Sequence, residues 1–338
     1  MLLKILNKHA GIISTGSYVP EKILNNAYFE NTVDTNNDWI ISRTGIEERR
    51  VADENTATSD LATKAALNAM EKSGVKPEEI DLIIVATVTP DFAFPSTACI
   101  VQKNIGAINA AAFDLEAACT GFMYGITIAD SFIKTGMYKK VLVIGAETLS
   151  KIIDYTDRNT CVLFGDGAGA VIMAEVDEGY GILSSHLGAN GSVGHLLSVP
   201  AGGSRMPSTE QTIRDKLHFV KMDGSEVFKF AIKIMGEAAE KALDNCGMKK
   251  EDIDFLIPHQ ANTRIIDAAV RRLKISPDKV FVNVQKYGNM SAASIAVALD
   301  EANDQQRLKD GSIVVLVGFG GGLTWGASVM RWKGVTNA

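Results

Sequence analysis

The amino-acid sequence predicts an α/β protein made of two related halves, each with a largely parallel sheet covered by helices. The main observation is an internal repeat: ALNAMEKSGVKPEEIDLII at residues 66–84 resembles AEKALDNCGMKKEDIDFLI at residues 239–257, at an offset of 173 residues. The same offset pairs VLVIG at residues 141–145 with VVLVG at residues 314–318. Two matches at one offset indicate a duplicated unit, with a pseudo-twofold axis between the copies.

Each copy of the longer block contains an amphipathic helix, a glycine that ends the helix, a short acidic turn and a buried strand. The glycines are Gly74 and Gly247, which match at the repeat offset. We therefore expect an N-terminal half over residues 1–177 and a C-terminal half over residues 178–338. In α/β sheets, ligand sites usually lie at the carboxyl ends of the strands.

Cys119 lies where an extended apolar segment gives way to a helical pattern over residues 121–137. Unpaired N–H groups and the helix dipole at such a position favour a thiolate and lower the pKa of a thiol. The small neighbours Ala117, Ala118 and Gly121 leave room for a substrate. The setting indicates a nucleophile, and the alternative is a buried structural cysteine, which is the commoner role of a free cysteine.

Two polar residues of the second half lie at comparable junctions. His259 directly follows a strand expected over residues 255–257, and Asn289 follows a strand expected over residues 279–284. At the repeat offset, Cys119 maps just beyond Asn289, so a twofold axis would bring these junctions together. A cysteine, a distant histidine and a distant asparagine can form a nucleophile with its activating and polarising partners. A hydrogen-bonded core histidine is the alternative for His259.

The composition argues against several classes of protein. The chain has 338 residues, 46% hydrophobic and 22% charged residues, and a formal net charge of −6, which disfavours a general nucleic-acid binder. Its cysteines show neither zinc-site spacing nor disulfide density, and Cys99, Cys161 and Cys246 are expected in the core. No apolar run approaches the roughly 20 residues that span a membrane. Residues 1–9 lack the apolar segment of a signal peptide, so we expect a cytoplasmic protein.

The glycine-rich stretch GDGAGA at residues 165–170 superficially suggests a nucleotide-binding loop. A dinucleotide fingerprint follows a strand and opens a helix. Here the β-branched run at residues 171–173 follows instead, so we expect a glycine-rich turn that enters a core strand.

Several motifs, in this order along nearly the whole chain, resemble those of the β-ketoacyl-acyl-carrier-protein synthase III family of the thiolase-like superfamily. They are DTNNDWI at 34–40, RTGI at 43–46, AACTGF at 117–122, TDR at 156–158, FGDGAGA at 164–170, PHQAN at 258–262, GNMSAAS at 288–294 and FGGGLTWG at 319–326. Elongating synthases are similar but carry Cys-His-His, and thiolases use a second cysteine. Chalcone-type synthases share Cys-His-Asn but lack the Trp39/Arg43 and Asp157/Arg158 motifs in this form.

The resemblance implies two fused βαβαβαββ halves in a five-layered αβαβα arrangement, in agreement with the repeat. It implies a triad of Cys119, His259 and Asn289, with an oxyanion hole from the backbone N–H groups of Cys119 and Gly321. In the implied reaction, Cys119 takes the acyl group of an acyl-CoA primer. A malonyl group on an acyl carrier protein then loses CO₂ and attacks the acyl-enzyme. The reaction starts fatty-acid synthesis and requires no metal or redox cofactor.

The resemblance also implies a CoA site. Trp39 and Arg158 would enclose the adenine, and Arg43 would bind the phosphates, because aromatic and guanidinium planes suit such stacking. Gly224 and Asn262 would contact the pantetheine arm. Ordinary surface contacts are the alternative for the first three residues.

The implied protein partners are a second subunit and an acyl carrier protein. Phe94 would close the acyl pocket of the partner subunit in a homodimer. Arg264 and Arg271 share the polar face of a helix expected over residues 263–274, and Lys229 lies on another helix. Further basic residues nearby are Lys233, Arg272 and Lys274. Such a face on an acidic protein suits an acidic carrier, and a merely solvated face is the alternative.

Two other functions stay open from the sequence. One is a related Cys-His-Asn condensing or acyl-transfer enzyme of secondary metabolism. The other is a catalytically silent scaffold on the same fold, which is disfavoured because Cys119, His259 and Asn289 are all present.

Overall fold

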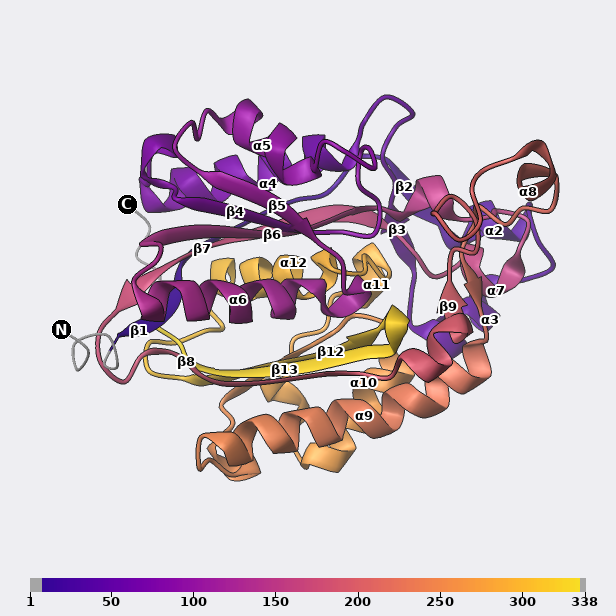
Figure 1. The fold of residues 1–338 in the computed structure, drawn as a ribbon. Helices are drawn as coiled ribbons and strands as arrows, with labels where there is room; N and C mark the ends of the chain where they lie inside the picture. Colours follow the sequence, from indigo (N-terminus) through magenta and orange to yellow (C-terminus); the bar gives the residue numbers. More distant parts are fainter. Residues whose placement is uncertain (1–7, 335–338) are drawn as a thin grey trace.

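The computed structural model describes residues 8–334, which form five layers in the order α, β, α, β, α (Figure 1). The layered α/β arrangement confirms the predicted fold class. Residues 1–7 lie outside the described residues. They make up most of residues 1–9, the segment on which the expectation about a signal peptide rests. Within residues 8–334, no helix is both long and apolar enough to cross a membrane.

The first sheet has the order β1-β7-β6-β4-β5. Its strands are β1 (His9–Tyr18), β4 (Leu82–Ala86), β5 (Ala111–Leu115), β6 (Lys140–Thr148) and β7 (Asp166–Val176). Strand β4 runs parallel to β5 and β6, while β7 is antiparallel to β1 and β6. Helices α4 (Thr58–Ser73) and α5 (Thr97–Ile105) cover the outer face, and α6 (Gly121–Thr135) covers the inner face (Figure 1).

The second sheet has the order β11-β12-β13-β8. Its strands are β8 (Gly181–Ala189), β11 (Phe255–Pro258), β12 (Ile313–Gly320) and β13 (Thr324–Arg331). Helices α9 (Gly224–Asn245) and α10 (Thr263–Leu273) form the other outer layer, and α12 (Ala293–Asp304) lies beside α6 in the central layer (Figure 1).

Short elements cap the end of the molecule that carries the candidate site. They are β2 (Ile23–Asn25), α2 (Asn26–Glu30), α3 (Asn37–Thr44), β3 (Glu48–Arg50), α7 (Arg158–Cys161), β9 (Leu197–Ser198), α8 (Glu210–Arg214), β10 (Lys221–Met222) and α11 (Val284–Tyr287). The 3₁₀ turns η2 (Ala118–Thr120) and η7 (Gly321–Leu323) lie at the ends of α6 and β12 that face each other.

The backbone supports the repeat that the sequence indicated. Gly74 and Gly247 both adopt the left-handed conformation, with φ of 67° and 71°. Ala118 and Ser291 also match at the offset of 173 residues, and both have positive φ, 45° and 46°. The two sheets fall on either side of residue 177, but the division into two domains stays a prediction.

The prediction of a strand over residues 279–284 is wrong. The structure has only a single bridge there, between Leu256 and Val280, and α11 follows. The buried side chain of Gln260 takes the place of a strand ladder: its amide nitrogen donates to the carbonyl of Phe281, at 3.2 Å. Its amide oxygen accepts from the backbone N–H of Asn283, at 2.9 Å. The N–H of Phe281 still donates to Leu256 of β11, at 3.0 Å, but after this bond the segment hydrogen-bonds to a side chain and not to the neighbouring strand.

Two smaller expectations also need correction. Helix α6 ends at Thr135, earlier than expected, because Gly136 adopts the left-handed conformation at φ 75°. Cys161 is buried as expected, but Cys99 is exposed, since it lies on the outward face of α5 opposite the buried Ala98 and Val101. The GDGAGA stretch does enter a strand, β7, as predicted.

The central layer holds the two halves together with one apolar core. Phe122 and Ile126 of α6 and Ile295 and Leu299 of α12 belong to a single buried cluster that reaches both sheets. Small residues allow this closeness: a Cβ on Gly145 of β6 would lie 2.2 Å from a carbonyl oxygen at the start of α12.

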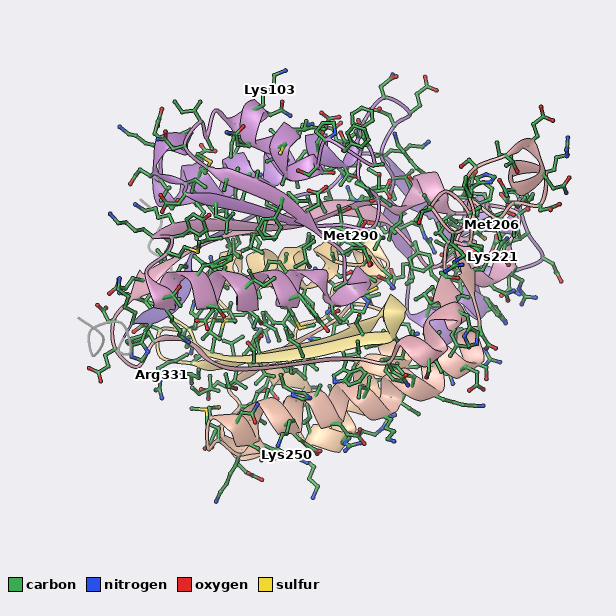
Figure 2. All side chains as sticks on the ribbon, in the orientation of Figure 1. Lys103, Met206, Lys221, Lys250, Met290 and Arg331 are labelled. Carbon is green, nitrogen blue, oxygen red and sulfur yellow. The ribbon has the colours of Figure 1, made fainter. Side chains whose placement is uncertain are left out.

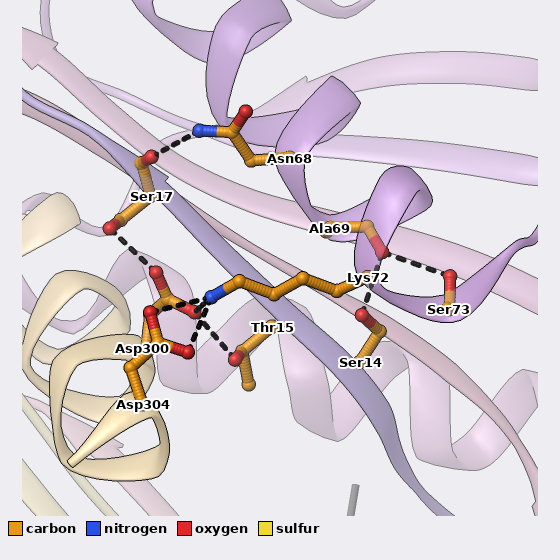
Figure 3. A network of polar contacts seen from close by, with 9 residues as sticks. All are labelled: Ser14, Thr15, Ser17, Asn68, Ala69, Lys72, Ser73, Asp300 and Asp304. Atoms are coloured by element: carbon orange, nitrogen blue, oxygen red, sulfur yellow. Dashed lines mark hydrogen bonds and ion pairs between the residues drawn. The ribbon is translucent and has the colours of Figure 1, made fainter. Parts of the chain in front are cut away.

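A polar network adds a second connection between the halves (Figure 3). Lys72 of α4 reaches past edge strand β1 and contacts Asp300 at 2.7 Å and Asp304 at 2.6 Å, both on α12. The hydroxyl groups of Thr15 and Ser17 donate to Asp300, at 2.6 and 2.7 Å. Asp300 is therefore a buried carboxylate of the C-terminal half, and its donors Thr15, Ser17 and Lys72 all come from the N-terminal half.

Asp300→Ala should lower the free energy of unfolding by about 2–4 kcal/mol, because it leaves buried donors without an acceptor. Asp304→Ala is the matched control, since the Asp304 side chain is 49% exposed, and it should change stability by only about 0–1 kcal/mol. Denaturant unfolding of both variants at pH 7 measures the difference. Equal losses would show that the network does not stabilise the contact between the halves.

Candidate active site

Cys119 lies in η2, directly before α6, and is 7% exposed. Its burial raises the pKa of the thiol to about 12, and the nearby Glu147 acts in the same direction. The Ser291 hydroxyl and the backbone N–H groups of Cys119 and Gly321 lower that pKa, but by less. The expectation of a lowered thiol pKa is therefore wrong for this structure, because desolvation outweighs the effect of the helix N-terminus.

The end of β12 approaches Cys119 so closely that only glycine fits there. A Cβ on Gly320 would lie 2.7 Å from the Cys119 nitrogen and 2.8 Å from its Cβ. This contact brings the N–H of Gly321 toward the sulfur, beside the N–H of Cys119 itself. Two backbone donors thus converge at one point, as an oxyanion hole requires.

His259 follows β11 and is 1% exposed. Its backbone N–H donates to the carbonyl of Val317 on β12, at 2.7 Å, and its ring lies edge-on to Phe319, with centroids 5.9 Å apart. Neither ring nitrogen has a hydrogen-bond partner among residues 8–334. Burial lowers the pKa of the imidazole to about 3, so the ring is neutral and can donate one hydrogen bond.

Asn289 is fixed at both its backbone and its side chain. Its N–H donates to the carbonyl of Leu163, at 2.9 Å, and its carbonyl accepts from Gly165, at 3.0 Å. Its side-chain oxygen accepts from the backbone N–H of Ser291, at 2.8 Å. The amide nitrogen of Asn289 is thereby left as the group that can donate to a ligand.

A cavity of about 750 Å³ opens beside Cys119. Apolar side chains make up much of its lining, including Leu149, Ile152, Phe164 and Val220. Its polar lining residues include Glu116 and Ser291. A cavity of this size suits a small molecule with an apolar part, presented to the sulfur of Cys119.

The residues implied for the CoA adenine lie together, but in a closed arrangement. The guanidinium carbon of Arg158 is 4.2 Å from the ring centroid of Trp39, so the two planes are in direct contact. Arg158 would have to swing away to admit a base between them. Arg43 is exposed in the last turn of α3, the same helix that carries Trp39.

The residues implied for the pantetheine arm lie at two helix starts. Gly224 is the first residue of α9 and is exposed. Asn262 is the N-cap of α10, where its side-chain oxygen accepts from the N–H of Ile265, at 2.9 Å. The amide nitrogen of Asn262 can therefore donate to a ligand while its oxygen caps the helix. These assignments stay predictions.

The basic residues implied for carrier binding differ in whether they form ion pairs with acidic side chains of this chain. Lys229 pairs with Glu226 at 2.7 Å, and Arg272 pairs with Glu237 and Glu240. Arg264 and Arg271 are exposed and form no ion pair within residues 8–334. The Arg264 guanidinium carbon lies 4.8 Å from the ring centroid of Phe228 on α9, which holds the side chain near the start of α10.

Phe94 is 87% exposed, an unusual position for a phenylalanine. Its neighbours Phe92 and Ala93 line the cavity, but Phe94 does not. The side chain is thus free to enter another molecule, and its role across a dimer stays a prediction. Among residues 8–334, no group of three or more His, Cys, Asp and Glu side chains is placed to hold a metal ion.

Sequence reasoning missed Gln260, Ser291 and Glu147. Glu147 is completely buried near the end of β6, and burial raises the pKa of its carboxyl to about 7. Its oxygens accept from the hydroxyl of Thr89, at 2.6 Å, and from the backbone N–H of Val88. A glutamate directly after the apolar run at residues 141–146 was the available signal, since charged residues rarely lie in buried strands.

Comparison with known proteins gives the same family for both parts of the chain. A family model described as 3-oxoacyl-[acyl-carrier-protein (ACP)] synthase III matches residues 113–191, and one described as the C terminal of that synthase matches residues 243–332. The β-ketoacyl-[acyl-carrier-protein] synthase III of Caldanaerobacter subterraneus subsp. tengcongensis is 61% identical over 324 residues, which cover 96% of this chain and 98% of that protein.

Two solved structures are similar over almost the whole fold. The 3-oxoacyl-[acyl-carrier-protein] synthase III from Aquifex aeolicus VF5 has a TM-score of 0.89 and 47% identity, over 96% of this chain and 100% of that one. The priming β-ketosynthase from the R1128 polyketide biosynthetic pathway has a TM-score of 0.90 and 33% identity, over 97% of each chain.

Glu147→Gln should change how stability depends on pH. The folded carboxyl keeps its proton to about pH 7, whereas its ordinary pKa is 4.5, so unfolding releases a proton between these values. The wild-type free energy of unfolding should fall by about 3 kcal/mol relative to Glu147→Gln as pH rises from 4.5 to 7. Denaturant unfolding across this range tests it. Parallel curves for the two proteins would show that the carboxyl ionises normally.

Proposed function

This chain belongs to the 3-oxoacyl-[acyl-carrier-protein] synthase III family, and we propose that it joins an acyl-CoA primer to a malonyl group carried by acyl carrier protein. The products are a 3-ketoacyl-carrier protein, CoA and CO₂, and the reaction starts fatty-acid synthesis. The chain is an acyltransferase, the class of enzyme to which a β-ketoacyl-[acyl-carrier-protein] synthase III belongs.

One observation supports the proposal for the site: His259 is buried, and both its ring nitrogens lack a partner among residues 8–334. It directly follows β11, the strand beside β12, whose end contacts Cys119. A buried polar group without a partner costs about 1–3 kcal/mol, so a ligand atom is expected to meet it. The thioester carbonyl of a malonyl group is such an atom, because it accepts hydrogen bonds and gains negative charge as CO₂ leaves.

In the first half-reaction, the Cys119 sulfur attacks the acyl-CoA carbonyl and CoA leaves. The carbonyl oxygen gains charge, and the N–H groups of Cys119 and Gly321 lie where they can stabilise it. The apolar lining of the cavity receives the acyl chain.

In the second half-reaction, the malonyl thioester occupies the site and loses CO₂. The neutral imidazole of His259 and the amide nitrogen of Asn289 donate to the thioester oxygen and stabilise the enolate that forms. The new carbanion attacks the acyl group on Cys119, and the cysteine sulfur leaves. This sequence needs no metal or redox cofactor.

The partner and location assignments rest on fewer observations. Trp39, Arg43 and Arg158 suit CoA recognition, and Arg264 with Arg271 suits an acidic carrier protein. The exposed Phe94 supports a homodimer. All four cysteines are free, which fits a reducing compartment, and we keep the cytoplasm as the proposed location.

A second candidate is a priming synthase of a specialised pathway with the same triad. The similarity to the priming β-ketosynthase of the R1128 pathway favours it, at 33% identity. The higher identity to a β-ketoacyl-[acyl-carrier-protein] synthase III, 61% for the Caldanaerobacter protein, favours the first proposal.

His259→Ala and Asn289→Ala should slow malonyl decarboxylation by about 10²–10³-fold, because each removes one donor to the enolate oxygen. Acylation of Cys119 by acetyl-CoA should be reduced less, since its oxyanion donors are backbone groups. Separate assays measure CO₂ release and the mass of the acyl-enzyme, with Cys119→Ala as the protein that forms no adduct. Equal losses in both half-reactions would contradict this division of roles.

Arg264→Glu should raise the KM for malonyl-carrier protein and leave the KM for acetyl-CoA nearly unchanged. The effect should shrink as salt is added, because screening weakens exposed charge interactions. Lys103→Glu makes the same change of charge on α5, in the opposite outer layer (Figure 2), and should leave both constants unchanged. Identical carrier kinetics for the two variants at low salt would show that the face of α10 is merely solvated.

A further inference from the structure

Glu147 is a titratable group beside the site that the reaction scheme above does not use. Its carboxyl faces the hydroxyl groups of Thr87 and Thr89 and the N–H of Val88, all directly after β4. Thr87 and Val88 line the same cavity as Ser291 and Cys119. The Ser291 hydroxyl is near enough to lower the pKa of the Glu147 carboxyl, and Glu147 is near enough to raise that of the Cys119 thiol. Of these groups, only Cys119 is titratable.

The hydroxyl of Ser291 is near both the carboxyl of Glu147 and the thiol of Cys119, since it lowers the pKa of each. Its oxygen nevertheless has no partner at hydrogen-bond geometry within residues 8–334, and the residue is 3% exposed. Because no hydrogen bond fixes it, this buried hydroxyl can rotate so that it accepts from the Cys119 thiol while it donates to the Glu147 carboxylate.

The backbone holds Ser291 at this place. Its φ is 46°, and its N–H donates to the side chain of Asn289 at 2.8 Å. Ala118, at the matching position of the first half, has φ of 45°. The two halves therefore place equivalent strained residues at the nucleophile, one of which carries a hydroxyl. Strain of this kind persists where the surrounding structure requires it.

We propose that Ser291 and Glu147 form a relay that holds the Cys119 proton while the cysteine carries the acyl group. Ser291 lines the same cavity as Cys119 and is the member that would exchange a proton with the sulfur, and Glu147 acts through it. The proposal deepens the function given above and rests on it for the acyl-transfer steps.

The protons and bonds balance over the cycle. As the sulfur attacks the acyl-CoA, the S–H proton passes to the Ser291 oxygen while the Ser291 proton passes to the Glu147 carboxylate. The thioester C–S bond to CoA breaks, and the CoA thiolate takes a proton from solvent. After decarboxylation, the carbanion attacks and the acyl–cysteine bond breaks. The Cys119 thiolate leaves and recovers its proton from Glu147 through Ser291.

Burial gives the relay a physical purpose. In a water-excluded site a thiolate is costly, and burial raises the pKa of the thiol to about 12. The carboxyl has a pKa of about 7, so near neutral pH it can take up and return a proton. Moving the proton within the cluster keeps one negative charge in the site, whereas losing it to solvent would place two there.

Alkylation of Cys119 by iodoacetamide tests the relay without any acyl-CoA, so its outcome is independent of the proposed function. The rate is followed by peptide mass spectrometry from pH 5 to 10, and the exposed Cys99 of the same chain serves as the internal reference. The wild-type profile should show an inflection near neutral pH. Ser291→Ala and Glu147→Gln should lose it and react at least about tenfold more slowly at pH 8, as expected for a lost general base.

A purely repulsive role of Glu147 would change the alkylation rates in a different way. If Glu147 only repels the thiolate, Glu147→Gln removes that repulsion and alkylation becomes faster, and Ser291→Ala leaves the neutral inflection in place. An unchanged or faster rate in Glu147→Gln overturns the relay. Should that variant fail to fold, Ser291→Ala decides alone, because it keeps the buried carboxyl.

A second carboxylate beside the same cavity provides the matched control. Glu116 lines the cavity and accepts from the N–H of Ala118 at 3.1 Å. Glu116→Gln should retain the neutral inflection of Cys119 alkylation. Loss of the inflection in this variant would assign it to charge in the cavity in general, and would overturn the role of Glu147.

Discussion

The close contact between the end of β12 and the turn that holds Cys119 is the constraint on which the site depends. No side chain fits at Gly320, where a Cβ would lie 2.7 Å from the Cys119 nitrogen. The contact brings the N–H of Gly321 from one half of the chain to the sulfur from the other. It requires the central helices α6 and α12 to pack closely, which their shared apolar core and the Asp300 network support.

Burial then decides the protonation of each group. The same desolvation that raises the thiol pKa of Cys119 lowers the imidazole pKa of His259, so both residues are neutral near pH 7. A neutral His259 suits a hydrogen-bond donor to an enolate better than a base that must hold a positive charge. Burial also raises the pKa of the Glu147 carboxyl, near Cys119, to about 7.

Much of the fold and site could be predicted because the chain is duplicated. The repeat fixed the equivalence of the halves, and the junctions at Cys119 and Asn289 followed from it. The prediction of a strand over residues 279–284 failed because the buried side chain of Gln260 takes up backbone hydrogen bonds that a neighbouring strand would otherwise make. The periodicity of the sequence does not reveal such a contact. The prediction of a lowered thiol pKa for Cys119 also failed. The sequence shows that the cysteine precedes a helix, but it does not show how deeply the thiol is buried, because burial depends on residues far away in the chain.

The mass of the product on the carrier protein tests the central claim most directly. The purified chain is given acetyl-CoA labelled in its acetyl group, together with malonyl-carrier protein, and the carrier is analysed by mass spectrometry. The account predicts a four-carbon 3-ketoacyl-carrier with the label in its two terminal carbons and one CO₂ released per product. Acetyl-carrier alone, formed by thioester exchange without loss of CO₂, would contradict it.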